Sequence, residues 1–352
     1  MKTKIVAISD KTIKKDIVEA GEIIKSGGLV AFPTETVYGL GGDAFNPLSS
    51  KKIYAAKGRP SDNPLIVHIA ELSDLEKVAV DIPENGYRLA KEFWPGPLTM
   101  IFNKTAELPH ETTGGLDTVA VRMPDNEIAL EFIKASTGFV AAPSANKSGR
   151  PSPTLAKYVI EDLDGLVEMI IDGGDSYIGL ESTIVDLTVT PPMILRPGYI
   201  TKEDLERVLG EGNVSIDKTI LDSSSKEAPK APGMKYRHYA PKAEMTLVSG
   251  NIEKVKNYIN TECENIKNKN MQTKTGVIAT DETCTEYRAD VIKSIGSRKN
   301  EASIARNLFR ILREFDDENV EFIFSESFSS EGISQATMNR MLKAAGHKEV
   351  VL

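Results

Sequence analysis

Residues 57–68 read Lys-Gly-Arg-Pro-Ser-Asp-Asn-Pro-Leu-Ile-Val-His and join a predicted helix, 48–56, to a predicted buried strand, 65–69. The glycine is typical of a helix end, and the proline favours extended backbone at the residue before it. The stretch is therefore a turn between a helix and a strand, and the prediction of the fold rests on the alternation of these two elements.

Two cations, Lys57 and Arg59, lie two residues apart in this turn. Residues i and i+2 of an extended chain point to one side, so the spacing predicts that both side chains form one positive site. An arginine fork beside a lysine point charge suits a polyphosphate. The alternative is a solvated turn with two surface cations, which the tripeptide alone favours. The motifs elsewhere in the chain favour the phosphate site.

The composition is that of a soluble globular protein. The 352 residues are 40% hydrophobic and 27% charged, and they are enough for two domains with cores of their own. No apolar run approaches the ~20 residues of a membrane span, and the first residues lack a secretory pattern. We therefore expect a cytoplasmic protein that has no membrane partner.

The charge and the cysteines argue against several kinds of site. A net charge of −8 argues against binding nucleic acid over a broad surface, so any anion site is expected to be a local pocket. Cys263 and Cys284 lie outside the motif-rich region without a Cys-x-x-Cys pattern, which predicts neither a disulfide framework nor a zinc site. We expect no metal held by protein ligands.

Helical and strand patterns alternate through the first 210 residues, although not strictly. Such a pattern favours a mixed, twisted, open α/β sheet over a barrel. Strands are expected at 29–32, 65–69, 98–102, 117–124, 139–142, 168–172, 180–187 and 193–198, and helices at 13–24, 48–56, 72–80, 83–93, 202–209 and from 154.

The chain is expected to have three parts: a catalytic domain at 1–210, an interdomain linker at 211–243 and a small α/β domain at 244–352. Within the linker, 231–241 is aromatic and basic, which a spacer does not need. We expect residues 232–241 to fold over the nucleotide as a lid. The last part is predicted to be Rossmann-like, with strands at 246–248, 276–279, 291–295 and 321–324 and helices at 252–259, 303–315 and 334–345.

Residues 33–44 are too polar and too rich in glycine to suggest a core element, so a loop is predicted there. Gly39, Gly41 and Ala44 formally satisfy the G-x-G-x-x-G/A spacing of a dinucleotide site. That motif belongs in the tight turn directly after a strand, but residues 33–38 intervene here, and no Lys-Ser/Thr pair follows. The dinucleotide interpretation is therefore not favoured.

A second polar loop, 141–154, carries Ser144 and Asn146 at the same i, i+2 spacing. Both are short hydrogen-bonding side chains that suit phosphate or ribose oxygens, but they are also ordinary turn residues. Arg122, near the end of a predicted strand, is either an edge cation or a buried receptor for a carboxylate. Trp94, the one tryptophan, is expected to be a packing anchor.

Several segments together resemble the threonylcarbamoyl-AMP synthase family, and the linker resembles that of its two-domain form. The resemblance covers the first 200 residues densely and the last hundred thinly. The segments that carry it are Phe32-Pro33-Thr34-Glu35-Thr36-Val37-Tyr38-Gly39-Leu40-Gly41, Lys57-Gly58-Arg59-Pro60, Asp62-Asn63-Pro64-Leu65, Trp94-Pro95-Gly96-Pro97, Val121-Arg122, Pro143-Ser144-Ala145-Asn146, residues 232–241 and Ala336-Thr337-Met338-Asn339-Arg340-Met341.

The resemblance implies that L-threonine, bicarbonate and ATP give threonylcarbamoyl-AMP and pyrophosphate. The product serves the modification of an adenosine beside the anticodon of tRNA, which a separate tRNA threonylcarbamoyl transferase machinery carries out. Mg2+ is expected on the triphosphate, through phosphate oxygens and water.

The resemblance also assigns roles to individual residues. Catalysis is implied for Lys57, Arg59, Ser144 and Asn146. ATP binding is implied for these four and for Asn63, Thr118, Ser152, Arg196, His238 and Tyr239. Threonine binding is implied for Thr34, Thr36, His68, Arg122, Ala142 and Ser182, with Arg122 as the receptor of the threonine carboxylate. Thr118 is also implied to line that pocket. For His68, hydrogen bonding is favoured over a general base, since a carbamate is already an anionic nucleophile.

Two rival functions remain. One is a module that binds double-stranded RNA or tRNA with the same basic pocket, for which the acidic balance argues at most weak RNA binding. The other is carbamoyl transfer to a maturation partner, but such proteins are expected to carry zinc-finger and acylphosphatase-like segments, which this sequence lacks.

Overall fold

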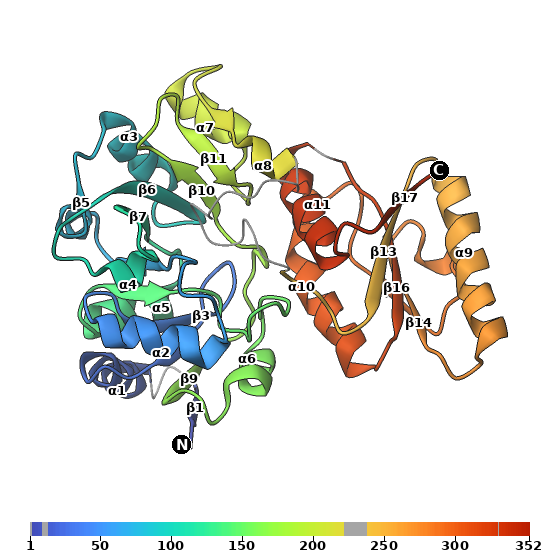
Figure 1. Cartoon of the computed structure of the whole chain (residues 1–352), viewed down its shortest axis with the longest axis horizontal. Coiled ribbons are helices and arrows are strands. Elements are labelled where there is room, and N and C mark those ends of the chain that lie inside the picture. Colours follow the sequence, from blue (N-terminus) through green and yellow to red (C-terminus); the bar gives the residue numbers. More distant parts are fainter. Residues whose placement is uncertain (1, 9–12, 222–237, 330) are drawn as a thin grey trace. The chain divides into compact units, whose positions relative to one another are not determined.

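The computed structural model describes residues 2–8, 13–221, 238–329 and 331–352. The chain forms two compact units (Figure 1). The N-terminal unit contains the described residues up to 148 and from 152 to 221, and the C-terminal unit contains 149–151 and the described residues from 238 onward. Residues 211–221, placed in the linker by the sequence, are therefore part of the N-terminal unit.

The N-terminal unit is built on one mixed sheet with the strand order β1-β9-β2-β3-β8-β4-β7-β6-β10-β11-β12, and β5 pairs with β6. The sheet contains parallel pairs, such as β4 with β7, and antiparallel pairs, such as β4 with β8. The strands are β1 (Lys4–Ala7), β2 (Val30–Phe32), β3 (Gly39–Asp43), β4 (Ile66–His68), β5 (Ala79–Val80), β6 (Leu98–Lys104), β7 (Thr118–Arg122), β8 (Val140–Ala142), β9 (Met169–Asp172), β10 (Thr183–Asp186), β11 (Met193–Arg196) and β12 (Ser215–Ile216).

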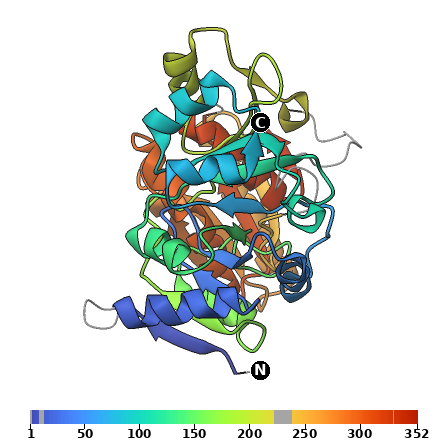
Figure 2. The same cartoon turned by 90° about the vertical axis from the view of Figure 1, so that its left-hand side faces the viewer.

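Helices cover both faces of this sheet. The helical segments are α1 (Ile13–Lys25), α2 (Pro47–Lys57), the 3-10 helix η1 (Leu72–Lys77), α3 (Glu84–Phe93), α4 (His110–Thr113), α5 (Glu127–Ala135), α6 (Ala156–Leu163), α7 (Lys202–Leu209) and α8 (Lys218–Leu221). The end that carries β11 and α7 lies opposite the N-terminus in both views (Figures 1 and 2).

Alternate residues of the central strands enter two separate cores, as the period of two in a strand requires. Val30 and Phe32 of β2 pack with α1 and α5, whereas Ala31 between them packs into the core on the other face with residues of α2, α3 and α6. The predicted mixed α/β sheet is confirmed.

The loop predicted at 33–44 is wrong over β3, which is a buried strand between β2 and β8. Its glycines are needed for close packing rather than for flexibility. A Cβ atom added at Gly41 would lie 2.7 Å from Cγ1 of Val140 and 3.1 Å from the ring of Phe32. The polar residues before the strand make local bonds, such as that from Oγ1 of Thr34 to the carbonyl of Val37 at 2.6 Å. Low hydrophobicity therefore does not indicate exposure here.

Trp94 is a packing anchor, as predicted. Its side chain is buried, and its indole nitrogen donates to the carbonyl of Leu98 at 2.7 Å. The bond holds the turn 94–97 against the start of β6.

The C-terminal unit is a five-stranded parallel sheet in the order β15-β14-β16-β13-β17. Its strands are β13 (Glu244–Ser249), β14 (Thr275–Ala279), β15 (Val291–Ser294), β16 (Phe322–Glu326) and β17 (Glu349–Val351), and its helical segments are α9 (Ile252–Lys269), η2 (Cys284–Glu286), α10 (Glu301–Asp317) and α11 (Gly332–Ala344). The predicted Rossmann-like α/β character is confirmed. The sequence missed β17 and ended α9 ten residues early, although Cys263 continues the buried face of the helix.

No helix of the described residues is long and apolar enough to cross a membrane. Both cysteines are free thiols, Cys263 buried and Cys284 half-buried.

The packing around β3 predicts that Gly41→Ala destabilises the N-terminal unit by ~1 to 3 kcal/mol, because a methyl group has no room between Val140 and the ring of Phe32. The free energy of unfolding is measured by denaturant titration with Trp94 fluorescence, which reports on the N-terminal unit because this chain has one tryptophan. Val18→Ala on exposed helix surface is the control and should change the free energy little. Equal stability of Gly41→Ala and the parent would contradict the packing argument.

Candidate active site

Lys57, Ser144 and Asn146 form one hydrogen-bonded cluster. The ammonium group of Lys57 donates to the carbonyl oxygens of Ser144 and Asn146, both at 2.5 Å, and the hydroxyl of Ser144 donates to Oδ1 of Asn146 at 2.5 Å. The main chain adds a bond from the amide of Ser148 to the carbonyl of Lys57 at 2.8 Å. Three of the four residues with implied catalytic roles are thus brought together between the end of α2 and the loop after β8.

The prediction that Lys57 and Arg59 point to one side of an extended chain is wrong. Lys57 is the last residue of helix α2 and is not extended, and Gly58 reverses the chain with a φ of 61°. Both cations are nevertheless buried, with exposed fractions of 3% for Lys57 and 8% for Arg59. The alternative of two solvated surface cations is therefore excluded.

The loop that follows binds Arg59. Its guanidinium donates to the carbonyl of Asn63 at 3.2 Å, to Oδ1 of the same residue at 2.6 Å and to the carbonyl of Pro64 at 3.0 Å. The structure thus joins Arg59 and Asn63, which were both expected at the nucleotide.

Arg122 is the centre of a second cluster, at the end of β7. Its guanidinium donates to Oγ1 of Thr36 at 2.9 Å and to the carbonyl of Gly96 at 3.3 Å, and Nη2 lies 2.6 Å from Oε1 of Glu35. Oγ1 of Thr36 is in turn 2.9 Å from Oγ1 of Thr34. Arg122 is therefore a buried cation and not an edge cation. Sequence reasoning missed Glu35 as a site residue, although it stands in the quoted motif between two predicted ones.

His68 lies beside Arg122, because the two residues are register partners of the parallel strands β4 and β7. Its Nδ1 is 3.1 Å from the carbonyl of Ile66, and its ring meets the edge of Phe32 with centroids 6.0 Å apart. Burial, and secondarily the positive charge of Arg122, lower the pKa of His68 to about 3. A neutral histidine of such low basicity suits hydrogen bonding better than proton abstraction.

A third cluster connects an implied threonine residue with an implied ATP residue. Arg196, on β11, donates to the carbonyl of Ser182 at 3.0 Å and to its hydroxyl at 3.1 Å. The same hydroxyl is 2.7 Å from that of Thr99 on β6. Ser152, also implied at the nucleotide, donates to a carboxylate oxygen of Glu181 at 2.7 Å.

In the described part of the chain, two further residues with implied roles, Ala142 and Thr118, form no hydrogen bond to the side chains of these three clusters. Ala142 ends β8, where it is paired with Ile66 of β4. Thr118 begins β7 and is four residues from Arg122, roughly 13 Å along the strand. The structure therefore does not bring Thr118 into the Arg122 cluster.

His238 and Tyr239 belong to the C-terminal unit. The ring of Tyr239 stacks on Phe309 of α10 at a centroid distance of 5.1 Å, and the amide of Ala240 donates to the carbonyl of Gly149 at 2.9 Å. Of the predicted lid, 232–237 lie outside the described residues.

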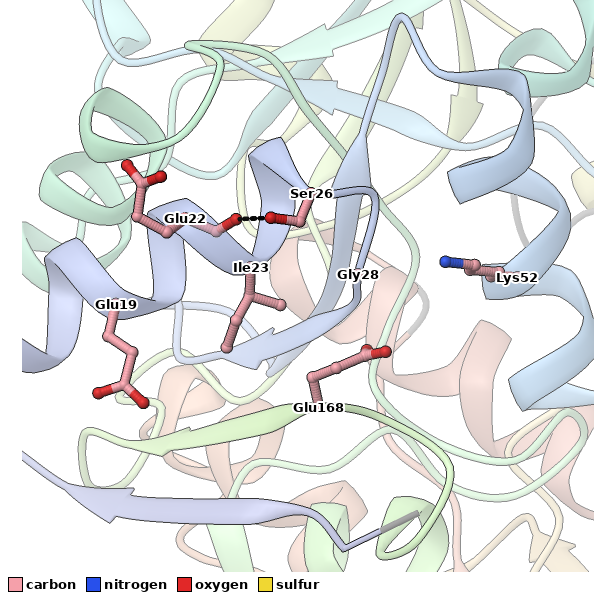
Figure 3. A pocket seen from close by; sticks show the side chains of 7 residues that line it. All are labelled: Glu19, Glu22, Ile23, Ser26, Gly28, Lys52 and Glu168. Carbon is pink, nitrogen blue, oxygen red and sulfur yellow. Dashed lines mark hydrogen bonds between the residues drawn. The ribbon is translucent and has the colours of Figure 1, made fainter.

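Two hollows contain none of the predicted site residues. One, of about 320 Å³, lies among α1, α2 and the start of β9 and is lined by Glu19, Glu22, Ile23, Ser26, Gly28, Lys52 and Glu168 (Figure 3). Its polar groups already have structural bonds, such as that from Lys52 to the carbonyl of Gly27 at 2.6 Å. The other, of about 350 Å³, lies between α9 and the sheet of the C-terminal unit.

Comparison with known proteins covers nearly the whole chain. A family model described as "Telomere recombination" matches residues 22–198, and one described as "Threonylcarbamoyl-AMP synthase, C-terminal domain" matches 200–346. The threonylcarbamoyl-AMP synthase of Pyrococcus abyssi is 48% identical over 346 residues, 98% of each chain. That of Bacillus subtilis is 45% identical and covers 99% of this chain and 100% of its own.

This chain belongs to the threonylcarbamoyl-AMP synthase family. A crystal structure of P. abyssi Sua5 complexed with L-threonine has a TM-score of 0.93 at 46% identity and covers 99% of this chain and 100% of that one. The family resemblance of the motifs is thus confirmed, together with the two-domain form.

The burial of His68 predicts a specific loss of stability in acid. Its folded pKa, about 3, lies below the ordinary value of 6.5, so between these values the unfolded chain binds a proton that the folded chain does not. This contribution is fully present above pH 6.5 and is lost as the pH falls toward 3, by at most ~1.4 kcal/mol per pH unit.

His68→Asn keeps a donor near the carbonyl of Ile66 but does not titrate, so its free energy of unfolding should fall less steeply from pH 6.5 to 4 than that of the parent. Denaturant titrations followed by Trp94 fluorescence measure the two slopes. His110→Asn, at an exposed position, is the control and should keep the parent slope. Identical slopes for all three proteins would show that His68 is not buried in its neutral form.

Proposed function

We propose that this protein makes threonylcarbamoyl-AMP and pyrophosphate from L-threonine, bicarbonate and ATP, for threonylcarbamoyladenosine modification of tRNA. The observation that carries the proposal is similarity over 98% or more of the chain to enzymes of this name. The complex of a relative with L-threonine supports the amino acid as a substrate of this chain too.

The chemistry requires an anionic nucleophile and a phosphate group held in line with it. The threonine amine captures CO2 as a carbamate, a carbamate oxygen attacks the α-phosphorus of ATP, and pyrophosphate leaves. Such transfers depend mainly on positioning and on stabilising charge. Lys57 and Arg59 supply positive charge, and the carbonyl groups of Ser144, Asn146, Asn63 and Pro64 fix where that charge lies.

The cluster around Arg122 suits the amino acid. An arginine forms paired hydrogen bonds with a carboxylate, and Arg122 is buried and held by three separate groups. Thr34, Thr36, His68, Ala142 and Ser182 provide short polar and small side chains for the rest of the pocket. The bonds between Ser182 and Arg196 connect the proposed amino-acid site with the proposed nucleotide site.

Mg2+ is proposed to accompany ATP and to neutralise part of the charge of the triphosphate. Among the described residues, no group of three or more His, Cys, Asp or Glu side chains could hold a metal ion. Phosphate oxygens and water would therefore be its main ligands.

The product is an activated intermediate, and a separate tRNA threonylcarbamoyl transferase machinery in the cytoplasm is the proposed consumer. RNA binding as the primary function is not favoured. A net charge of −8 does not suit the binding of RNA over a broad surface, and the relatives that match nearly the whole chain are threonylcarbamoyl-AMP synthases.

Pyrophosphate release from ATP should require both L-threonine and bicarbonate, because neither alone forms the carbamate. A coupled phosphate assay in degassed buffer, with each substrate omitted in turn, measures this dependence. An ordinary amino-acid adenylating enzyme would release pyrophosphate with threonine in bicarbonate-free buffer. That result, or release indifferent to threonine, would refute the proposed reaction.

Lys57→Ala and Arg59→Ala should each lower the rate of pyrophosphate release by about 100-fold or more, the usual effect of removing a preorganised charge contact. Lys91→Ala, at an exposed position of α3, is the control and should retain the parent rate. Trp94 fluorescence verifies that each variant is folded. A folded variant of either cation with near-normal turnover would remove that residue from the proposed site.

A further inference from the structure

Glu35 is a fully buried carboxylate that the proposed reaction does not use. It lies between Thr34 and Thr36, just before β3, and its exposed fraction is 0%. Its main chain is fixed by a bond from the amide of Ile178 to its carbonyl oxygen at 2.8 Å. Burying a charge is costly unless a partner compensates it, so its contacts are informative.

The one ion pair of Glu35 in the described chain is with Arg122, at 2.6 Å between Oε1 and Nη2. Neither carboxylate oxygen receives a well-aligned hydrogen bond, so the attraction is mainly one of charge. The other groups bound to Arg122, the hydroxyl of Thr36 and the carbonyl of Gly96, are neutral. Glu35 is therefore the charge that balances Arg122 within the described residues.

This balance changes what the site attracts. A lone buried arginine would bind any small anion, and the reaction itself supplies one, bicarbonate. Together Arg122 and Glu35 have no net charge. A plain carboxylate is therefore attracted by Arg122 and repelled by Glu35. A zwitterion also carries a positive group. This group is attracted by the charge of Glu35 and can donate to Oε2 of Glu35, which has no hydrogen-bond partner among the described residues.

We propose that Glu35 is a specificity-determining residue: paired with Arg122, it makes the amino-acid site select a zwitterionic α-amino acid and reject simple carboxylate anions. The inference rests on the proposed function, because it takes the carboxylate of L-threonine as the ligand of Arg122. It concerns selectivity and assigns Glu35 no part in the chemical step.

The test compares two ligands that differ in one group, which is charged in one ligand and neutral in the other. L-Threonine is compared with (2S,3R)-2,3-dihydroxybutanoate, in which a hydroxyl replaces the ammonium group, and both dissociation constants are measured by calorimetry. The parent should prefer threonine by about 10 to 100-fold, as expected for a unit charge roughly 6 to 12 Å away at an effective dielectric constant near 20.

Glu35→Gln keeps the shape and removes the charge, so the preference for threonine should fall by about tenfold or more, with the dihydroxy acid bound more tightly than by the parent. Glu35→Asp keeps the charge and should restore much of the preference. Glu168→Gln is the matched control, since Glu168 is a partly buried carboxylate that accepts a bond from the amide of Leu29 at 2.7 Å. It should leave the preference unchanged.

A parent protein that binds both ligands equally well would overturn the inference, and this measurement needs no variant to fold. The inference also fails if folded Glu35→Gln keeps the parent preference. Failure of the parent to bind L-threonine at all would instead contradict the proposed function, and the inference would fail with it.

Discussion

The proposed nucleotide site depends on the attachment of Lys57 to the loop after β8. The side chain of Lys57 donates to two carbonyl groups of that loop, and its own carbonyl accepts from the amide of Ser148. Hydrogen bonds from a charged group are each worth ~1.5 to 3 kcal/mol, and more is lost when a buried partner is left unpaired. The bonds therefore place a cation and at the same time hold Ser144 and Asn146 in one conformation.

The protein has a net charge of −8, but a local anion site is still possible because each cation of the site is fixed by its own set of neighbouring groups. Arg59 is bound by carbonyl groups of its own loop, Arg196 by Ser182 and Arg122 by a carboxylate. A hydrogen bond to a carbonyl group orients a cation, whereas the carboxylate of Glu35 also balances the charge of Arg122.

Hydrophobic periodicity predicted most helices and strands, because the central strands are buried on both faces and read as apolar runs. It failed at β3, where the neighbouring Phe32 and Val140 fill the space above glycines, and no property of the glycines themselves reveals that packing. The site residues were found through motifs. The role of Glu35 could not be predicted from the sequence. A glutamate between two threonines does not reveal that it is buried or that its partner is Arg122, 87 positions away.

Gly149–Pro151 belongs to the C-terminal unit although the residues on both sides of it do not. The carbonyl of Pro151 accepts two bonds from the guanidinium of Arg313, at 3.0 and 2.7 Å, within that unit. During synthesis the ribosome reaches Arg313 only after all strands of the N-terminal unit have been made. A chain that ended before residue 313 would contain every strand of the N-terminal unit but would lack the partner of the Pro151 carbonyl.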